Sequence, residues 1–217
     1  GSLLVSTKER CCNLCQKTGI LGGTFNPIHT GHLFAAEAAR DAFDLNQVLF
    51  IPTGDPPHKK SSRLASGEDR IQMIQKAVCD NPAFKLDTRE VERKRTTYTI
   101  DTLKELKEQY PHDELYFIIG GDTLLKLRTW RDFSSVAGLC DFIVYGRFGY
   151  NIREQEEEAI RLQQSFRAKI HFVAGPYLDV SSNDIRNRLE KNQTIRYLLP
   201  DEVVIYIKEH NLYKGDW

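Results

Sequence analysis

The segment that decides the fold is Gly19-Ile20-Leu21-Gly22-Gly23-Thr24-Phe25-Asn26-Pro27-Ile28-His29-Thr30-Gly31-His32. A short apolar run (19–21) leads into paired glycines, and an alanine-rich stretch (33–39) follows the second histidine. This order predicts a buried strand, a tight loop and a helix. Glycine has no Cβ, so Gly22 and Gly23 would let a ligand approach the backbone closely.

The helix that follows this loop should begin with an anion site. Its first turn offers unpaired N–H groups and the positive end of the helix dipole, which favour a phosphate. His29 and His32 fall at that end, and an imidazole can donate a hydrogen bond or carry positive charge near neutral pH. Neither a Walker A pattern nor G-x-G-x-x-G occurs in the chain, so we expect another kind of phosphate loop. The alternative is a helix-capping loop with two surface histidines.

The rest of the chain alternates between two apolar patterns. Short runs predict strands at 48–51, 84–87, 115–119, 141–145 and 170–173, and helical spacing covers 68–79, 99–110, 182–191 and 200–210. This alternation predicts an α/β fold: a Rossmann-like, doubly wound, mostly parallel sheet with helices on both faces. Ligands bind such sheets beyond the carboxyl ends of the strands. The clusters Gly22-Gly23, 53–55 and 120–122 end three predicted strands, so we expect one site built from several loops.

Composition limits the classes of function. The 217 residues include 30 basic and 30 acidic side chains, and this zero net charge argues against nucleic-acid binding. No apolar run approaches the length of a membrane span, and no signal peptide is visible, so we expect a cytoplasmic protein that does not bind membranes. We expect residues 1–18 to form a flexible tail and residues 19–217 a single domain. The acidic run 154–158 is expected to be the solvated face of a helix.

Five cysteines are present. Cys11, Cys12 and Cys15 crowd the tail and could form half of a zinc site, or simply a reduced tail in the cytosol. Cys79 and Cys140 lie in apolar surroundings, so we expect small buried side chains.

Two further clusters could bind anions. Pro56-Pro57-His58-Lys59 is a rigid turn followed by donors, suited to a polyanion, although an exposed basic loop is an equal alternative. Ser181 and Ser182 open a helix with Arg186 one turn in, which predicts either a second anion site or a plain N-cap with a surface arginine.

Aromatic and polar residues near the fourth predicted strand suggest a pocket for a base. Asp122 could accept hydrogen bonds from a ribose diol or cap a helix, and Trp130 could stack on a base or pack in the core. Thr97 or Thr99 is expected to be the N-cap of the helix 99–110.

Taken together, these residues resemble the bacterial nicotinate-mononucleotide adenylyltransferase family, within the nucleotidyltransferases that share His-x-Gly-His. The resemblance spans about 19–213. Its narrower part rests on the motifs 56–59, 97–99, 118–122, Trp130, 181–186 and the ending 199–213. Three positions depart from the usual family pattern: Asn26 stands for Asp, Asn183 for Thr, and 147–149 for Arg-Pro-Gly.

The resemblance implies adenylyl transfer from ATP to nicotinate mononucleotide by in-line attack, with no covalent intermediate and with Mg²⁺ bound through the ATP phosphates. No carboxylate cluster suggests a dedicated metal cage. The small molecules ATP and nicotinate mononucleotide would be its only partners, and an oligomer is possible. Related alternatives are transfer to nicotinamide mononucleotide or phosphopantetheine, or a non-catalytic nucleotide-binding regulator.

The resemblance also implies roles for single residues. Catalytic roles fall to His29, His32, Lys59 and Arg186. ATP would be bound by Gly22, Gly23, Thr24, Phe25, Gly31, Ser181, Ser182 and Ile185. The mononucleotide would be bound by His58, Tyr98, Thr99, Gly120, Asp122, Trp130 and Arg131.

Overall fold

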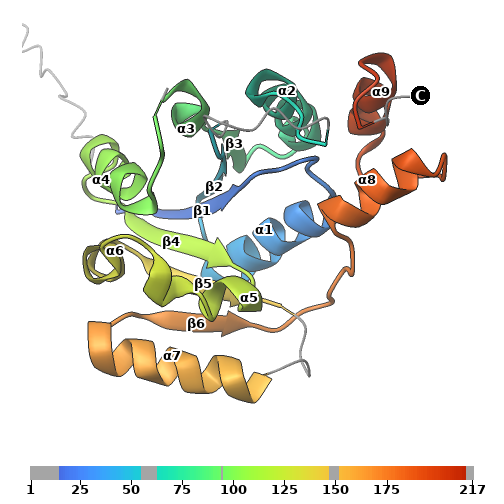
Figure 1. Ribbon diagram of the computed structural model, residues 1–217. Coiled ribbons are helices and arrows are strands. Elements are labelled where there is room, and N and C mark those ends of the chain that lie inside the picture. Colours follow the sequence, from blue (N-terminus) through green and yellow to red (C-terminus); the bar gives the residue numbers. More distant parts are fainter. Residues whose placement is uncertain (1–14, 55–62, 94, 147–151, 214–217) are drawn as a thin grey trace, which may run out of the picture.

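The computed structural model describes residues 15–54, 63–93, 95–146 and 152–213, and all structural statements below concern these ranges. Six parallel strands form one sheet in the order β3-β2-β1-β4-β5-β6 (Figure 1). The strands are β1 (Lys17–Gly23), β2 (Gln47–Pro52), β3 (Phe84–Leu86), β4 (Glu114–Ile119), β5 (Asp141–Tyr145) and β6 (Ile170–Val173). This doubly wound sheet confirms the predicted fold class.

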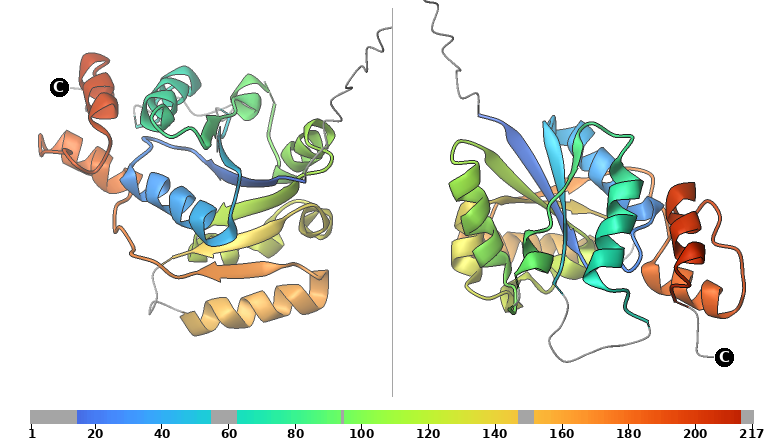
Figure 2. Two further views of the ribbon diagram at one scale, coloured as in Figure 1. Left: turned by 180° about the vertical axis from the view of Figure 1, so that it is seen from behind. Right: turned by 90° about the horizontal axis from the view of Figure 1, so that it is seen from above.

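Helices cover both faces of the sheet (Figures 1 and 2). One face carries α1 (Thr30–Phe43), α2 (Gly67–Val78) and, beyond them, α8 (Ser182–Glu190) and α9 (Asp201–Glu209). The other carries α4 (Thr99–Gln109), α5 (Gly121–Leu124), η1 (Leu127–Thr129), α6 (Phe133–Leu139) and α7 (Ile152–Phe166). The short helix α3 (Arg89–Glu92) follows β3. The six predicted strands and the five predicted helices are all present. Apart from α1, for which no exact ends were predicted, each lies within one or two residues of its expected ends.

The strands feed two separate cores because successive side chains point to opposite faces. Leu21, Phe50 and Ile118 pack beneath α1 and α2, whereas Ile20 and Ile119 pack beneath α4 and α6. Both sets are buried, which explains the near-continuous apolar runs in the sequence.

The first strand begins at Lys17, before the predicted start at Gly19. Thr18 is fully buried, and its hydroxyl donates to the carboxylate of Asp113 over 2.9 Å. A hydrophobicity pattern cannot show that a polar residue such as Thr18 belongs to a buried strand, because it does not show the residue's hydrogen-bond partner. The expected boundary between tail and domain therefore falls inside β1, and residues 1–14 lie outside the described ranges.

Three smaller expectations were wrong in whole or in part. Glu154, Glu156 and Glu157 of the acidic run are exposed on α7, as expected, but Glu158 is buried and pairs with Arg128 over 2.5 Å. Cys79 is exposed at the end of α2, whereas Cys140 is buried as expected. The N-cap of α4 is Tyr98, so neither threonine beside it takes that position.

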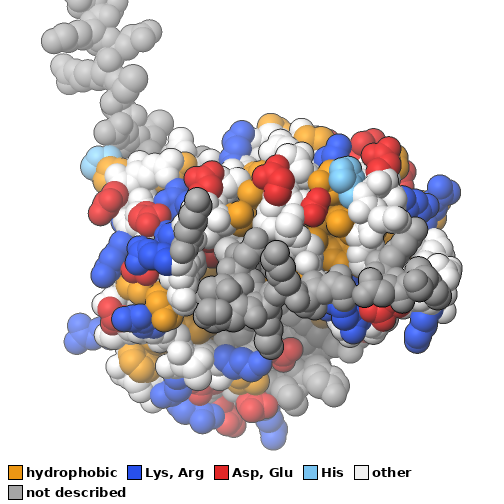
Figure 3. Space-filling model, turned by 45° about the horizontal axis from the view of Figure 1, so that its top comes forward, with side chains coloured by type: hydrophobic (Ala, Val, Ile, Leu, Met, Phe, Trp, Pro, Cys, Tyr) orange, Lys and Arg blue, Asp and Glu red, His pale blue; other side chains and the backbone are white. Residues whose placement is uncertain are grey.

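Basic and acidic side chains are mixed over the face shown in Figure 3, in line with the zero net charge. No helix in the described ranges is both long and apolar enough to cross a membrane.

Candidate active site

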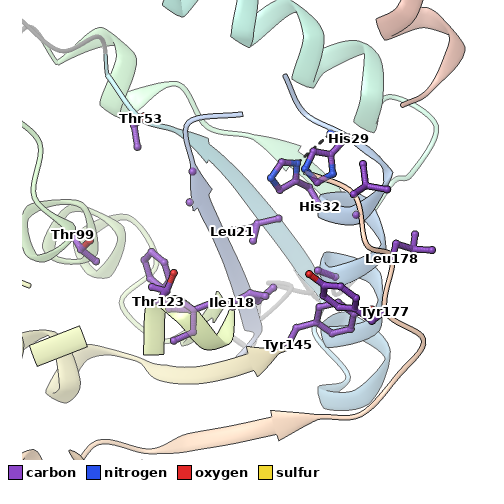
Figure 4. Close-up of a pocket in the computed structure, with 18 of the residues that line it drawn as sticks. Leu21, His29, His32, Thr53, Thr99, Ile118, Thr123, Tyr145, Tyr177 and Leu178 are labelled. Atoms are coloured by element: carbon purple, nitrogen blue, oxygen red, sulfur yellow. Dashed lines mark hydrogen bonds between the residues drawn. The ribbon is translucent and has the colours of Figure 1, made fainter. Parts of the chain in front are cut away.

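A cavity of about 470 Å³ opens at the carboxyl ends of β1, β2, β4 and β5 (Figure 4). The chain leaves β1 toward one face of the sheet and leaves β4 toward the other, so the cavity lies at the topological switch point. The structure brings three predicted loops together here: Gly22 and Gly23, Thr53, and Gly120 all line the cavity.

His29 and His32 lie side by side on the wall of this cavity, at the start of α1 (Figure 4). Their rings stack with centroids 3.7 Å apart. The backbone N–H of His29 donates to Nδ1 of His32 over 3.2 Å. An Nδ1 that accepts a hydrogen bond leaves the proton of a neutral ring on Nε2. His32 therefore presents an N–H donor at Nε2.

Both rings are neutral at pH 7 in the protein without ligand. Burial lowers the pKa of His29 to about 4. Burial, with a smaller effect from the charge of His29, lowers the pKa of His32 to about 3. Of the two roles that the sequence allowed, hydrogen-bond donation is thus the one available before a phosphate binds.

The β1–α1 loop (residues 24–29) is shaped tightly around these rings. Phe25 has a left-handed backbone with φ 51°, is buried, and meets His32 edge-on at 5.0 Å. A Cβ at Gly31 would lie 3.0 Å from Cε1 and Nδ1 of His29. Glycine at this position therefore keeps that edge of the ring open. Nδ1 of His29 is buried, and no group in the described ranges bonds to it.

The contacts of Asn26 account for an amide where the family usually has Asp. Its side chain donates to the carbonyl of Arg63 over 2.6 Å and accepts from the N–H of Ala65 over 3.0 Å. An aspartate could accept the second bond but could not donate the first. The amide therefore suits the backbone that faces it in this chain.

The predicted second anion site lies next to this loop, but its side chains contact protein atoms. The hydroxyl of Ser182 donates to the carbonyl of Pro27 over 2.8 Å, and Nη1 of Arg186 donates to the carbonyl of Asn26 over 2.6 Å. Ser181 is the N-cap of α8 and bonds both the N–H and the carboxylate of Asp184.

Arg186 and Ile185 of this cluster differ in how they relate to the cavity. Burial lowers the pKa of Arg186, and its Nε has no hydrogen-bond partner among the described residues. Ile185 is fully buried in the core, so its side chain supports α8 and does not line the cavity.

Trp130 and Thr99 both line the cavity. Trp130 also meets Phe117 and Phe142 edge-on, with ring centroids 5.4 and 6.2 Å away. Trp130 is therefore both a core residue and part of the cavity wall, so the two alternatives that the sequence left open do not exclude each other.

Three other predicted residues do not line the cavity. Asp122 is exposed on α5, although Gly120 and Thr123 beside it do line the cavity. Arg131 lies over the ring of Tyr98, 4.5 Å from its centroid, and Tyr98 is 36% exposed. His58 and Lys59 lie outside the described ranges.

Sequence reasoning missed several cavity residues, among them Glu90, Tyr145 and Tyr177. Glu90 of α3 is partly buried, and its carboxylate accepts from the hydroxyl of Thr102 over 2.7 Å. Desolvation raises its pKa. Tyr145 and Tyr177 line the side opposite Thr99 and Thr123 (Figure 4). No local motif marks these three, because only the fold brings their elements together.

This arrangement defines a class of protein. The cavity has two aromatic sides and, beside them, a helix N-terminus with two neutral imidazoles, which suits the joining of two nucleotides through their phosphates. The family model described as cytidylyltransferase-like matches residues 20–188, and the chain is thus a nucleotidyltransferase.

The relatives narrow this class. The chain is 47% identical over 199 residues to the "Probable nicotinate-nucleotide adenylyltransferase" of Desulfitobacterium hafniense strain Y51, covering 92% of this chain and 96% of that one. It is 43% identical to the protein of the same name from Moorella thermoacetica, covering 91% and 92%. The protein belongs to the nicotinate-nucleotide adenylyltransferase family, which confirms the resemblance and the enzyme class expected from its motifs.

A solved structure shares the fold. The nicotinic acid mononucleotide adenylyltransferase of Plasmodium falciparum, complexed with APC, superposes with a TM-score of 0.73 at 21% identity, covering 91% of this chain and 97% of that one. The same enzyme has also been solved in complex with NaAD.

Proposed function

We propose that this protein transfers the adenylyl group of ATP to nicotinate mononucleotide, forming deamido-NAD and pyrophosphate. The observation that carries the proposal is the stacked, neutral histidine pair at the start of α1, on the wall of a cavity with two aromatic sides. Relatives above 40% identity carry the name of this activity, which supports the choice of substrates.

The reaction needs no covalent intermediate, because the mononucleotide phosphate is already an anionic nucleophile. It attacks the α-phosphorus of ATP in line, and pyrophosphate leaves. Catalysis then consists of positioning and of stabilising the charge that develops on the phosphate oxygens. The N–H groups of Thr30 and His32 already donate to the carbonyls of Leu198 and His29. The donors that we assign to this charge are therefore Nε2–H of His32 and the N–H of Gly31, in the first turn of α1.

We assign the two bases to opposite sides of the cavity. The indole of Trp130 and the hydroxyl of Thr99 would hold the pyridine ring, and Tyr145 and Tyr177 would border the adenine. Glu90 also lines the cavity, and we assign to it the ribose role that the sequence suggested for Asp122. With this arrangement both phosphates meet beside the histidines.

Other expected contacts remain part of the proposal. Arg186 lies with its Nε unpartnered among described groups, which supports a contact with the departing pyrophosphate. His58 and Lys59 are expected to neutralise phosphate charge. The cytoplasmic location stays a prediction.

The described side chains fit a Mg²⁺ ion that enters with ATP. Within the described ranges, no three His, Cys, Asp or Glu side chains gather so that they could hold a metal ion. We expect the ion to take its ligands from phosphate oxygens and water. When bound, it would neutralise charge on the phosphates.

The test is to incubate the protein with ATP, Mg²⁺ and nicotinate mononucleotide, and to measure pyrophosphate and the dinucleotide by mass spectrometry. We expect both products in equal amounts, and we expect the His32→Asn variant to form them at least a hundredfold more slowly. A non-catalytic regulator would bind ATP and release no pyrophosphate.

A further inference from the structure

Three carbonyl groups of the β1–α1 loop accept hydrogen bonds from side chains of other elements. The carbonyl of Thr24 accepts from Nη1 of Arg70 over 3.0 Å. Those of Asn26 and Pro27 accept from Arg186 and Ser182, as described above. Of these three contacts, the one from Arg70 comes from α2, and the other two come from α8.

Arg70 is fully buried, with no exposed surface. Besides Thr24, its guanidinium donates to the carbonyl of Thr53 over 2.8 Å and to that of Ala65 over 3.2 Å. Thr53 itself lines the cavity, and its N–H donates to the carbonyl of Gly23 over 2.9 Å. One side chain therefore ties the loop after β1 to the loop after β2, beneath the cavity.

The direction of these bonds matters. A trans peptide is planar, so its N–H points opposite to its C=O. Fixing the carbonyl of Thr24 toward Arg70 turns the N–H of Phe25 away from Arg70. The same argument turns the N–H of Gly54 away when the carbonyl of Thr53 is fixed. A buried cation that accepts no hydrogen bond also favours this orientation electrostatically, because carbonyl dipoles point their negative ends at it.

We propose that Arg70 is a positioning residue for phosphate binding: it never touches ATP, but it orients the N–H of Phe25 so that the loop can bind the ATP phosphates. The inference rests on the proposed use of ATP. It gives this buried arginine a function that a general role in packing α2 would not supply.

The test compares Arg70→Met and Arg70→Lys with Met73→Ala. Met73 is also fully buried on α2, but it packs in the core under the helix. Residues that orient the ligands of a metal typically change activity or affinity by about 10- to 100-fold when replaced, and we take the lower end of this range for Arg70. For Arg70→Met we expect the KM for ATP to rise about tenfold and kcat to fall, while the KM for the mononucleotide stays within twofold. Met73→Ala should lower the thermal midpoint and leave all three constants unchanged at 25 °C.

Arg70→Lys keeps the charge but has one ammonium group in place of the guanidinium fork, so it should recover part of the ATP affinity. If Arg70→Met does not fold, binding of inorganic tripolyphosphate to Arg70→Lys, measured by calorimetry, decides the matter, with at least a threefold loss expected. Wild-type tripolyphosphate affinity in a folded Arg70 variant would overturn the proposal. So would an equal rise in the KM for ATP in Met73→Ala. Tripolyphosphate binding does not depend on the acceptor, so this result stands even if the protein does not use nicotinate mononucleotide.

Discussion

Two substitutions of His32 separate its two roles. Asn places an acceptor close to the position of Nδ1 and removes the donor at Nε2, whereas Gln places a donor close to Nε2 and removes the acceptor at Nδ1. In the structure, Nδ1 accepts the N–H of His29 over 3.2 Å, and Nε2 is the proposed donor to phosphate. Both variants lose the ring contacts with His29 and Phe25, so this loss cancels when the two are compared.

The magnitudes follow from these contacts. Losing a donor that stabilises charge in the transition state lowers kcat by about 10²–10³, or about 3–4 kcal/mol. Losing the acceptor for the N–H of His29 costs about 1 kcal/mol of folding free energy, which is about 2–4 °C in midpoint for a chain of this size. We therefore expect His32→Asn to be the slower enzyme and His32→Gln the less stable protein.

The assay measures pyrophosphate release at saturating substrates, with thermal unfolding on the same preparations. The reasoning fails if His32→Asn retains kcat within fivefold of the wild type. It also fails if His32→Gln is as slow as His32→Asn while its midpoint is unchanged, because the orientation assigned to the ring would then be wrong.

Three further predictions follow. Trp130→Ala should raise the KM for the mononucleotide about tenfold, since stacking is worth about 0.5–1.5 kcal/mol beyond burial, while the KM for ATP stays constant; equal rises in both would show that the residue acts only through the core. Glu90→Gln should raise the thermal midpoint at pH 7 but not at pH 4. Burial raises the pKa of the Glu90 carboxyl, so the stability that its protonated form provides is lost as pH rises through that pKa. A gain of equal size at both pH values would contradict a raised pKa for Glu90. Without ligand, the free energy of unfolding should fall as pH drops from about 6.5 toward 4, because the unfolded chain binds protons that the buried, neutral His29 and His32 do not bind. The expected fall is about 1.4 kcal/mol per pH unit for each histidine. Urea titrations of His32→Asn should therefore show a weaker dependence of the unfolding free energy on pH than those of the wild type.

Much of the fold could be predicted from the sequence because the strands are buried on both faces and read as apolar runs. The start of β1 could not, since the buried Thr18 is polar and its hydrogen-bond partners Asp113 and Gln47 lie far along the chain. Glu158 was misjudged for the same reason: its partner Arg128 lies on another element, and local charge patterning does not show such partners.

The candidate site also contains residues that the sequence could indicate and residues that it could not. The paired glycines and His29 and His32 form a continuous motif whose chemistry is local, and the structure places them together on the cavity wall. Glu90 and Arg70 reach the site only through the packing of α3 and α2 against the end of β2, so no motif could indicate them.

The most direct test of the account is a competition assay. The protein would be given ATP, Mg²⁺ and equal concentrations of nicotinate mononucleotide, nicotinamide mononucleotide and phosphopantetheine, and the adenylylated products would be counted by mass spectrometry. We expect deamido-NAD to be the main product, and we expect the sum of the adenylylated products to equal the pyrophosphate released. A larger yield of either other product, or ATP binding with no adenylylated product at all, would contradict it.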